Sequence, residues 1–501
     1  MAARLSTLLA TLPPGMLLDS NGDAEVTAPV VEASGEVHPG AVFVARVGLG
    51  RDGHDFIPAA IAAGAVAIVG EREISGLAVP YARVRDAQQA VGYLAAEYHG
   101  NPSRHLTVVG VTGTDGKTTT STLVRAVLEA GLGRRVGLMT TLNADTGDAT
   151  TDVGLHVTTP GAPQVQSLLA QMVRNGLTHV VVEMTSHGLA QGRLNGVEVD
   201  AAVMTNLTHE HLDYHGTFEA YRDAKGILFE RAAGGIAVVN ADDENAGYFA
   251  ELAAGATVLR YGMDDAAQTR AEAVEYGPRG TRFTVGGHPF RTALLGRFNV
   301  SNVLAAITLG RAFGFDDDAI QRGLDAVVAI DGRLERIDEG QPFTAIVDFA
   351  HTPNSLGAVL GVCRQMLGEG GRLIVVFGSA GLRDREKRAL MAKVAVAQAD
   401  LTVLTAEDPR TESLDEILAE MDAAATAAGS ERGRTHVVVP DRGAAILYAC
   451  EQASAGDLVI ACGKGHEQSM AFGTTEYPWD DREAMRSALR GTALATLPTA
   501  D

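Results

Sequence analysis

LTVVGVTGTDGKTTTSTLVRAVLEAG (106–131) is the stretch that decides the fold. It begins with a run rich in β-branched residues, passes through a glycine-rich turn, and continues with the leucine and valine spacing of an amphipathic helix. Backbone N–H groups in such a turn, together with the helix N-terminus, favour bound phosphate. Gly113 and Gly116 keep side chains out of the turn, Lys117 can reach the outer phosphates, and Thr118 offers a hydroxyl to magnesium.

This motif departs from the strict Walker pattern, which has glycine six residues before the lysine, where this chain has Val111. A plain glycine-rich turn after a strand is the alternative interpretation. Strand, glycine spacing, lysine, threonine and helix coincide here, however, and together they favour a phosphate loop.

Working outward from the loop, short apolar runs alternate with Ala- and Leu-rich segments over almost the whole chain. Most of the runs are apolar throughout, which is typical of parallel strands buried on both faces. The pattern predicts an α/β protein with repeated βαβ units, and helices at 118–131 and 384–399. The predicted strands are 41–46, 106–111, 179–184, 201–206, 236–240, 344–349, 372–377, 401–405, 436–439 and 458–462.

A chain of 501 residues is too long for one core, and its length indicates about three domains. Polar breaks at 98–105 and 329–343 predict domains at 1–103, 104–332 and 333–501. The block 262–292 has little helical pattern and is expected to form an antiparallel insertion in the middle domain.

Composition excludes several classes of protein. The net charge of −21 argues against a nucleic-acid partner, which would need a basic face. Cys363, Cys450 and Cys462 lack metal-ligand spacing and suggest a reducing compartment. The apolar run near residue 10 is too short for a signal peptide with a cleavage site, and the stretch 57–70 is too short for a membrane span, so we expect a cytoplasmic protein without membrane insertion.

Acids, histidines and a lysine follow the central predicted strands, where an open α/β sheet binds its ligands. Glu183 ends one strand; an acid there could also simply cap a helix. The segment 186–196 is a polar, glycine-rich loop, and 205–216 contains three histidines. Lys225 lies on a predicted helix, where an ordinary surface lysine is the alternative.

The histidine cluster suggests a transition metal, but no cysteine accompanies it and Glu183 prefers hard cations. With ATP implied by the loop, magnesium bridging phosphate to Glu183 and His211 is the better interpretation. We expect His209 and His215 to be solvated loop residues.

The strings GVTGTDGKTTT, EMTSHGLAQGRLNGV, TNLTHEHLDYHG and DAKGILF resemble, in order and spacing, the middle domain of the Mur ligases of bacterial cell-wall synthesis. The resemblance covers nearly the whole chain. It implies a three-domain architecture: an N-terminal UDP-sugar-binding domain, a central ATP-binding domain with a P-loop-type parallel sheet, and a C-terminal, Rossmann-like amino-acid-binding domain. It also implies that Lys225 is carbamylated and joins Thr118, Glu183 and His211 as a magnesium ligand.

The family also implies a nucleotide site that the C-terminal domain completes by closing over ATP and excluding water. For Asp348, a buried acid bonded only to backbone is the alternative. The implied nucleotide contacts are Gly113, Thr114, Asp115, Gly116, Thr118, Thr119, Asn299, Asn302, Arg333, Asp348 and His351.

Three late motifs, 377–388, 405–413 and 462–470, resemble the family's amino-acid pocket. Together with TTP (158–160) and Ser186 they are typical of members that add a diamino acid to UDP-N-acetylmuramoyl-L-alanyl-D-glutamate. The implied substrate contacts are Ser34, Thr158, Thr159, Ser186, Gln191, Arg193, Arg383, Glu407, Asp408, Pro409, Arg410, Gly463 and Glu467.

Two places depart from the family pattern. Near the uridine site the family commonly has D-S-R, and this chain has Ala33, Ser34 and Gly35. Diaminopimelate-adding members have D-N-P-R where this chain has Asp408 in place of the asparagine. An added carboxylate favours the purely cationic end of L-lysine or L-ornithine, whereas the retained Arg410 favours the distal carboxylate of meso-diaminopimelate. We expect a slight preference for lysine or ornithine.

The resemblance implies an ATP-dependent ligase that acts as a monomer through an acyl phosphate, with Lys117, His211 and Lys225 catalytic. His211 could serve as base or only as metal ligand. A folylpolyglutamate synthetase is one alternative, disfavoured by the residues before 105 and by the GKGHE segment. A non-catalytic nucleotide-binding regulator is another, disfavoured because Lys117, Glu183 and Lys225 are all present.

Overall fold

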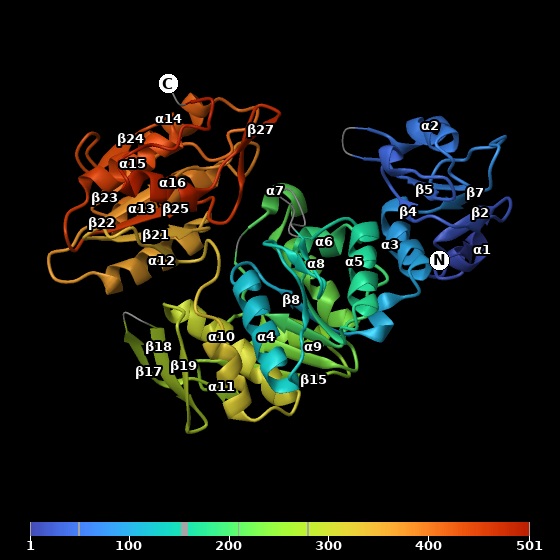
Figure 1. Ribbon diagram of the computed structural model, residues 1–501, viewed down its shortest axis with the longest axis horizontal. Coiled ribbons are helices and arrows are strands. Elements are labelled where there is room, and N and C mark those ends of the chain that lie inside the picture. Colours follow the sequence, from blue (N-terminus) through green and yellow to red (C-terminus); the bar gives the residue numbers. More distant parts are fainter. Residues whose placement is uncertain (1, 49–50, 152–158, 209, 278–279, 500–501) are drawn as a thin grey trace.

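The computed structural model describes residues 2–48, 51–151, 159–208, 210–277 and 280–499, which form three lobes in chain order (Figure 1). Each lobe contains its own main β-sheet with helices packed on it. The sheets span residues 17–84, 107–270 and 335–462. These changes of sheet support our proposed domain boundaries after residues 103 and 332.

The N-terminal lobe is built on a five-stranded sheet in the order β2-β7-β6-β5-β4, parallel except for β2. The apolar stretch 57–70 forms a short helix and a strand, and no helix in the described part of the chain has the length and apolarity needed to cross a membrane. The elements are β1 (Ala3–Arg4), α1 (Leu5–Leu9), β2 (Leu17–Ser20), β3 (Glu25–Val26), β4 (Val30–Val31), β5 (Val42–Ala45), α2 (Ile57–Ala62), β6 (Ala67–Gly70), β7 (Tyr81–Val84) and α3 (Ala87–Tyr98).

The central lobe has a nine-stranded sheet in the order β11-β10-β9-β12-β8-β13-β14-β15-β16. β10 pairs antiparallel with both of its neighbours, β9 and β11. All the other neighbouring strands of this sheet pair in parallel. The strands are β8 (Thr107–Thr112), β9 (Gly137–Met139), β10 (Ala144–Asp145), β11 (Thr150–Thr151), β12 (His179–Glu183), β13 (Ala201–Met204), β14 (Ile236–Asn240), β15 (Thr257–Gly262) and β16 (Thr269–Arg270).

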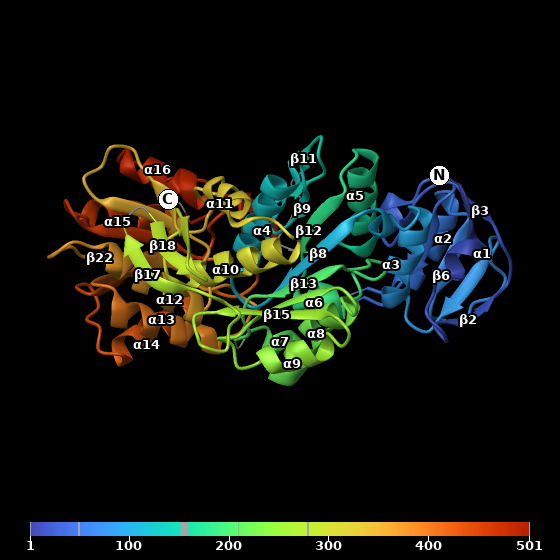
Figure 2. The same cartoon turned by 90° about the horizontal axis from the view of Figure 1, so that it is seen from below.

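Helices cover both faces of this sheet, as the continuously apolar strands predict. Val109 and Val111 of β8 belong to the core under α4, α10 and α11, and Val108 to the core under α5, α8 and α9. Figure 2 shows α4, α10 and α11 on one side of the central strands and α8 and α9 on the other. The helices are α4 (Lys117–Leu132), α5 (Ala162–Arg174), α6 (Ser186–Ala190), α7 (Leu212–His215), α8 (Phe218–Arg231), α9 (Ala246–Leu252), α10 (Arg297–Ala312) and α11 (Asp317–Asp325).

The predicted antiparallel insertion is confirmed. It is a separate three-stranded sheet of β17 (Glu272–Gly277), β18 (Gly280–Val285) and β19 (His288–Thr292). Phe283 and Phe290 from its buried face join the core under α10 and α11.

The C-terminal lobe has a six-stranded sheet in the order β20-β21-β25-β22-β23-β24, parallel except for β20. Its two-sided helical cover is Rossmann-like, although β25 lies between β21 and β22. The elements are β20 (Glu335–Ile337), β21 (Thr344–Asp348), α12 (Pro353–Met366), β22 (Leu373–Phe377), α13 (Glu386–Gln398), β23 (Leu401–Leu404), α14 (Leu414–Ala427), β24 (His436–Val438), α15 (Arg442–Gln452), β25 (Leu458–Cys462), β26 (Ser469–Phe472), β27 (Thr475–Pro478) and α16 (Asp481–Leu489).

A buried ion pair fixes the ends of two strands in this lobe. Arg442, fully buried, pairs with Asp481 at 2.6 Å and donates to the carbonyl oxygens of Ala406 and Cys462, at 3.2 and 2.8 Å. Because every partner is hydrogen-bonded, the charge is tolerated in the core. The three cysteines are buried free thiols, as their spacing predicted.

Candidate active site

The phosphate loop connects β8 to α4, and its backbone is possible only with glycine. Gly113 and Gly116 have φ of 148° and 81°, in the region that L side chains avoid. A Cβ on Gly113 would lie 1.8 Å from Thr205 Oγ1, and one on Gly116 would lie 2.5 Å from Asn302 Oδ1. The two glycines therefore let the loop pack against β13 and α10, and the amides of Thr114 and Asp115 donate to Asn206 at 2.8 and 2.9 Å.

Two lysines hold the loop through neutral carbonyl groups. Lys117 Nζ donates to Thr114 O at 2.7 Å, and Lys225 Nζ donates to Gly113 O at 2.6 Å. Lys225 is 2% exposed, and burial, reinforced by the charge of Lys117, lowers its pKa well below the ordinary value. The bland interpretation of Lys225 as a surface lysine is therefore wrong, because α8 packs against the sheet and turns this residue under the loop.

Thr118, in the first turn of α4, lies next to Glu183, the last residue of β12. Glu183 accepts a hydrogen bond from Thr118 Oγ1 at 2.9 Å, and others from Thr141 N and Oγ1 at 3.2 and 3.1 Å. A hydroxyl beside a buried carboxylate is a donor set that suits magnesium. Within the described residues, no three His, Cys, Asp or Glu side chains form a metal-binding group. Thr141 has no motif that would have identified it from sequence.

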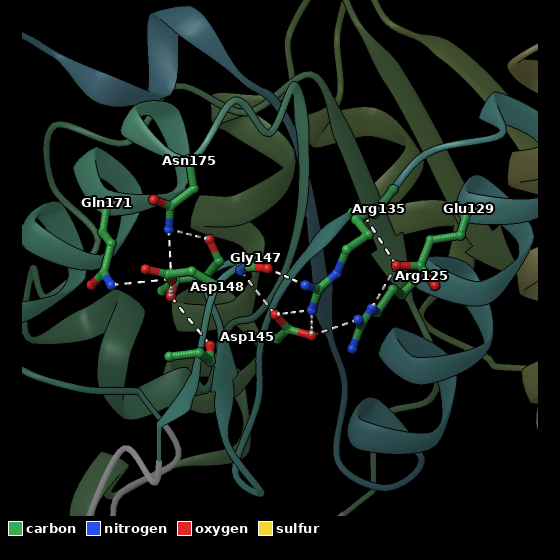
Figure 3. Close-up of polar contacts among 11 residues, drawn as sticks. Arg125, Glu129, Arg135, Asp145, Gly147, Asp148, Gln171 and Asn175 are labelled. Carbon is green, nitrogen blue, oxygen red and sulfur yellow. Dashed lines mark hydrogen bonds and ion pairs between the residues drawn. The ribbon is translucent and has the colours of Figure 1, made fainter.

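The segment with Thr141 is attached to the phosphate-loop helix by an ion-pair network (Figure 3). Asp145 of β10 pairs with Arg125 of α4 at 2.6 Å and with Arg135 at 3.0 Å. Arg125 also pairs with Glu129, one helical turn further on. Because Asp145 is buried, this network fixes the β9–β10 connection relative to α4.

His211 belongs to an aromatic cluster at the edge of the loop. Its ring lies 4.7 Å from His187, and its backbone is left-handed, with φ of 56°. Burial lowers the pKa of His211 to about 4 and that of His187 to about 3, so both imidazoles are neutral near pH 7. His215 packs on His187 and Tyr221 at 5.3 and 5.4 Å. The expectation that His215 is solvated was wrong because α7 folds back onto α8; His209 lies outside the described residues.

The two asparagines predicted near adenine form a buried pair behind the loop. Asn302 Nδ2 donates to Asn299 Oδ1 at 3.0 Å, and Asn302 Oδ1 accepts from Thr120 Oγ1 at 3.2 Å. Asn299 Nδ2 donates to Leu295 O at 2.8 Å. The bond between Asn302 and Thr120 ties α10 to α4. Two other predicted nucleotide contacts lie nearby: Thr119 is buried, and Thr114 Oγ1 bonds to Tyr221 Oη.

The C-terminal lobe reaches the phosphate loop through two polar contacts. His351 Nε2 lies 3.4 Å from Glu210 Oε1, and Asn354 Nδ2 donates to Asp115 Oδ2 at 3.2 Å. Burial raises the pKa of Asp115, and Glu210 adds to that shift. Glu210 belongs to the predicted histidine-rich segment 205–216, but its contact with His351, like that of Asn354 with Asp115, arises only through the packing of the lobes.

Arg333 and Asp348 lie close together at the start of this lobe. The Arg333 guanidinium stacks 4.3 Å from the Phe349 ring centroid. Asp348 accepts from the backbone N–H groups of Leu334 and Ala350 at 2.6 and 2.7 Å, and burial raises its pKa. The described hydrogen bonds of the Asp348 carboxylate go only to backbone, as in the alternative in which Asp348 is a structural residue. Contact of Asp348 with a nucleotide stays a prediction.

The loop after β12 is held by Arg193. Its guanidinium donates to Thr159 O at 2.7 Å and to Gln191 Oε1 at 2.6 Å. Thr159 and Ser186 are each 1% exposed, and Thr159 Oγ1 lies 3.0 Å from Thr185 Oγ1. Thr158 lies outside the described residues. The predicted residues of this loop thus occupy one compact corner of the central lobe.

Ser34 lies in a short turn after β4, partly exposed, on the side of the N-terminal lobe that faces this corner. The neighbouring Glu32 pairs with Arg46 at 2.8 Å. A Cβ on Gly161 would lie 2.9 Å from Glu32 Oε1, so the two lobes approach closely here.

In the predicted amino-acid pocket, Asp408 is buried and paired. Its carboxylate oxygens lie 3.0 Å from Lys464 Nζ, and Oδ1 accepts from Ala471 N at 2.9 Å. Lys464, fully buried, also pairs with Glu467. Lys464 belongs to the GKGHE segment that the sequence analysis singled out, but its pairing with Asp408 was not predicted.

Glu407 is buried beside Gly463, where a Cβ would lie 2.3 Å from Glu407 Oε2. This oxygen has no hydrogen-bond partner among the described residues, and burial raises the pKa of Glu407. Arg383 is exposed, and its charge contributes to the low pKa of His187 in the central lobe. The three late motifs therefore lie against one another, since Gly381 N donates to Asp408 O at 3.0 Å and Asp408 pairs with Lys464.

Comparison with known proteins identifies the family. Residues 111–310 match the Mur ligase middle domain, residues 332–465 the Mur ligase glutamate ligase domain, and residues 33–99 the Mur ligase family catalytic domain. The chain belongs to the Mur ligase family. Members of this family are ATP-dependent ligases that form amide bonds.

Two curated relatives of this Mur ligase match it over nearly their full lengths. The UDP-N-acetylmuramyl-tripeptide synthetase of Roseiflexus sp. (strain RS-1) is 44% identical over 92% of this chain and 94% of its own length. The UDP-N-acetylmuramoyl-L-alanyl-D-glutamate--2,6-diaminopimelate ligase of Geobacillus thermodenitrificans (strain NG80-2) is 40% identical over 97% of this chain and 99% of its own length.

Solved structures show the same architecture. A UDP-N-acetylmuramoyl-L-alanyl-D-glutamate--2,6-diaminopimelate ligase is 33% identical with a TM-score of 0.64, covering 92% of this chain and 94% of its own. A folylpolyglutamate synthase of Mycobacterium tuberculosis is 17% identical with a TM-score of 0.58, covering 74% of this chain and 91% of its own. That second likeness concerns the fold alone.

The loop geometry generates a first prediction. Lys117→Ala should reduce ligation at least about a thousandfold, because it removes the cation placed at the phosphate loop. Thermal melting should be unchanged, since Lys117 bonds only to a loop carbonyl among the described contacts. Near-normal turnover in a variant that melts like the wild type would contradict the assignment of the loop.

Proposed function

We propose that this Mur ligase adds a diamino acid to the D-glutamate of UDP-N-acetylmuramoyl-L-alanyl-D-glutamate, in peptidoglycan synthesis. The D-glutamate γ-carboxylate takes the γ-phosphoryl group of ATP, giving an acyl phosphate and ADP. The amine of the incoming amino acid then attacks the acyl carbon, loses a proton, and displaces phosphate to leave an amide.

The observation that supports this proposal most is that predicted site segments of the central lobe lie next to both of the other lobes. His351 and Asn354 of the C-terminal lobe contact Glu210 and Asp115 beside the phosphate loop. The charge of Arg383 in the C-terminal lobe reaches His187 after β12 and contributes to its low pKa, and Gly161 of the central lobe lies against Glu32 of the N-terminal lobe. A nucleotide, a precursor and an amino acid would thus be held around one point, which a ligase needs.

The chain's own residues have separate tasks in this proposal. Lys117 and the glycine-rich loop would hold phosphate, and Thr118 and Glu183 would supply oxygen ligands for magnesium, which would neutralise charge on the phosphoryl group. Burial lowers the pKa of His211 to about 4, so near pH 7 its neutral imidazole can bind a metal but is a weak base, which favours the ligand role.

We propose that Lys225 is carbamylated. Its nitrogen is buried and bonds to the carbonyl of Gly113, and its lowered pKa favours the neutral amine, which is the form that attacks carbon dioxide and then loses a proton. The resulting carbamate would place a negative charge under the loop, near Lys117, and could supply an oxygen ligand to magnesium.

For the amino acid we propose L-lysine or L-ornithine. Asp408 adds a negative charge to the pocket and also engages Lys464, a cation that could otherwise attract a distal carboxylate. Arg410 donates to Gly381 O at 3.0 Å, so part of its guanidinium is already bonded within the pocket. These contacts favour a side chain that ends in an ammonium group alone.

The direct test measures phosphate release by the purified full-length enzyme with ATP, the UDP-muramoyl dipeptide and one amino acid at a time. Lysine, ornithine and meso-diaminopimelate are compared, with alanine as control. Release that depends on a diamino acid supports the proposal. Release with none of them, while ATP binds, would overturn it.

Lys225→Ala should be nearly inactive, and acetate or formate should restore part of the activity, because a free carboxylate can take the place of the carbamate. Lys225→Arg is the control, since it retains a cation that carbon dioxide does not modify, and should be inactive without rescue. An unmodified lysine mass at position 225 combined with an active alanine variant would contradict the carbamate.

Asp408→Asn should shift the ratio of kcat/KM for diaminopimelate over lysine upward by about tenfold or more, because it removes one negative charge and frees Lys464. The measurement is that ratio in both forms of the enzyme. A wild type that already prefers diaminopimelate, or an unchanged ratio, would show that Asp408 does not set the choice.

A further inference from the structure

The two loops that carry Arg383 and Arg410 are joined along their backbones. Gly381 N donates to Asp408 O at 3.0 Å, and Arg410 Nη1 donates to Gly381 O at 3.0 Å. Leu382, Asp408 and Arg410 have φ of 55°, 40° and 53°. Such left-handed conformations are unfavourable for L residues, so neighbouring contacts must hold them in place.

Glu412 supplies one of these contacts. Its Oε1 accepts from the backbone N–H of Leu382 at 2.5 Å, and its Oε2 accepts from Arg388 Nη2 at 2.6 Å. Arg388, on α13, has a side chain that is only 1% exposed. A buried arginine thus holds a carboxylate, and that carboxylate holds the residue immediately before Arg383.

Glu420 is a natural comparison, because it binds the same arginine from α14. Its Oε2 lies 3.0 Å from Arg388 Nη1, and it also pairs with Arg385. The side chains of Glu412 and Glu420 are similarly exposed, at 26% and 33%. Among the described contacts, Glu420 joins only the two helices, whereas Glu412 also reaches the pocket loop.

We propose that Glu412, held by Arg388, is a positioning residue for the incoming amino acid. It touches no substrate; it fixes the left-handed turn at Leu382 and thereby the direction of Arg383. This inference rests on the proposed function, since it assumes that Arg383 and Arg410 bind the amino acid. Loss of the Glu412 contact should therefore raise the KM for the amino acid selectively.

The experiment compares Glu412→Gln with Glu420→Gln in the full-length enzyme. Glutamine at 412 cannot accept from both Leu382 and Arg388, so we expect the KM for the amino acid to rise about tenfold. The KM for ATP and for the UDP-muramoyl dipeptide should change less than about twofold. Glu420→Gln should leave all three values within about twofold, although both variants lose one charged bond to Arg388.

Thermal melting of both variants identifies any that does not fold. If Glu412→Gln fails to fold, Glu412→Asp takes its place; its shorter side chain cannot span Leu382 and Arg388, and it should show the same selective rise. Equal rises in the two variants, or no rise at position 412, would overturn the inference while an active wild type leaves the proposed function intact. A wild type that joins no diamino acid would instead overturn the proposed function.

Discussion

The hydrogen bond from Thr118 to Glu183 depends on the parallel register of β8 and β12, and the candidate active site is built around it. Val111 of β8 pairs with Glu183 of β12, so the carboxyl ends of the two strands stop together. β13 continues the same edge on the other side of β8. Because parallel strands bring their carboxyl ends to one edge, segments far apart in sequence deliver the loop, the acid and the histidine cluster to one place.

Charge is distributed within the site in a way that the net charge of −21 conceals. Lys117 bonds to a neutral carbonyl oxygen, so its charge remains available to anionic ligands. Lys464 is the opposite case, since two carboxylates engage it in the predicted amino-acid-binding segments. Lys117 thus keeps its charge for a ligand, whereas the charge of Lys464 is neutralised within the protein.

Most of the fold followed from local patterns in the sequence. Each predicted strand is present within a few residues, because a run that is apolar on both faces must be covered on both faces. Gly113, Thr118 and Glu183 could be predicted because their chemistry depends on spacing within one motif or on the end of one strand. The same holds for the antiparallel block, where the helical pattern was missing.

Other features required tertiary register that no local pattern contains. Lys464 lies 56 residues from Asp408, and they meet because β25 inserts between β21 and β22. His351 meets Glu210 only through the packing of two lobes. His215 was misjudged because a short polar helix gives no sign, in sequence, of folding back onto aromatic neighbours.

Backbone strain gathers where the ligand sites are predicted. His211, Leu334, Leu382, Asp408 and Arg410 all have positive φ, and each lies in or beside a predicted site segment. Folding alone does not require this, since glycine would fit a left-handed turn at lower cost. The side chains are retained because their direction matters, and hydrogen bonds such as that between Asp348 and Leu334 maintain the strained turns.

The contacts between the central and C-terminal lobes at the loop are polar and partly exposed, in contrast to the apolar cores within each lobe. Polar groups of this kind exchange protein partners for water at little cost, so these contacts at the loop can break and re-form, although Phe298 of α10 also packs on the C-terminal core. A ligase that must exclude water from an acyl phosphate, and then release a large product, needs an interface with this property. The two features are complementary: internal hydrogen bonds hold the strained turns of the predicted amino-acid-binding segments, and the polar contacts at the loop are those that the closure implied by the family resemblance would make and break.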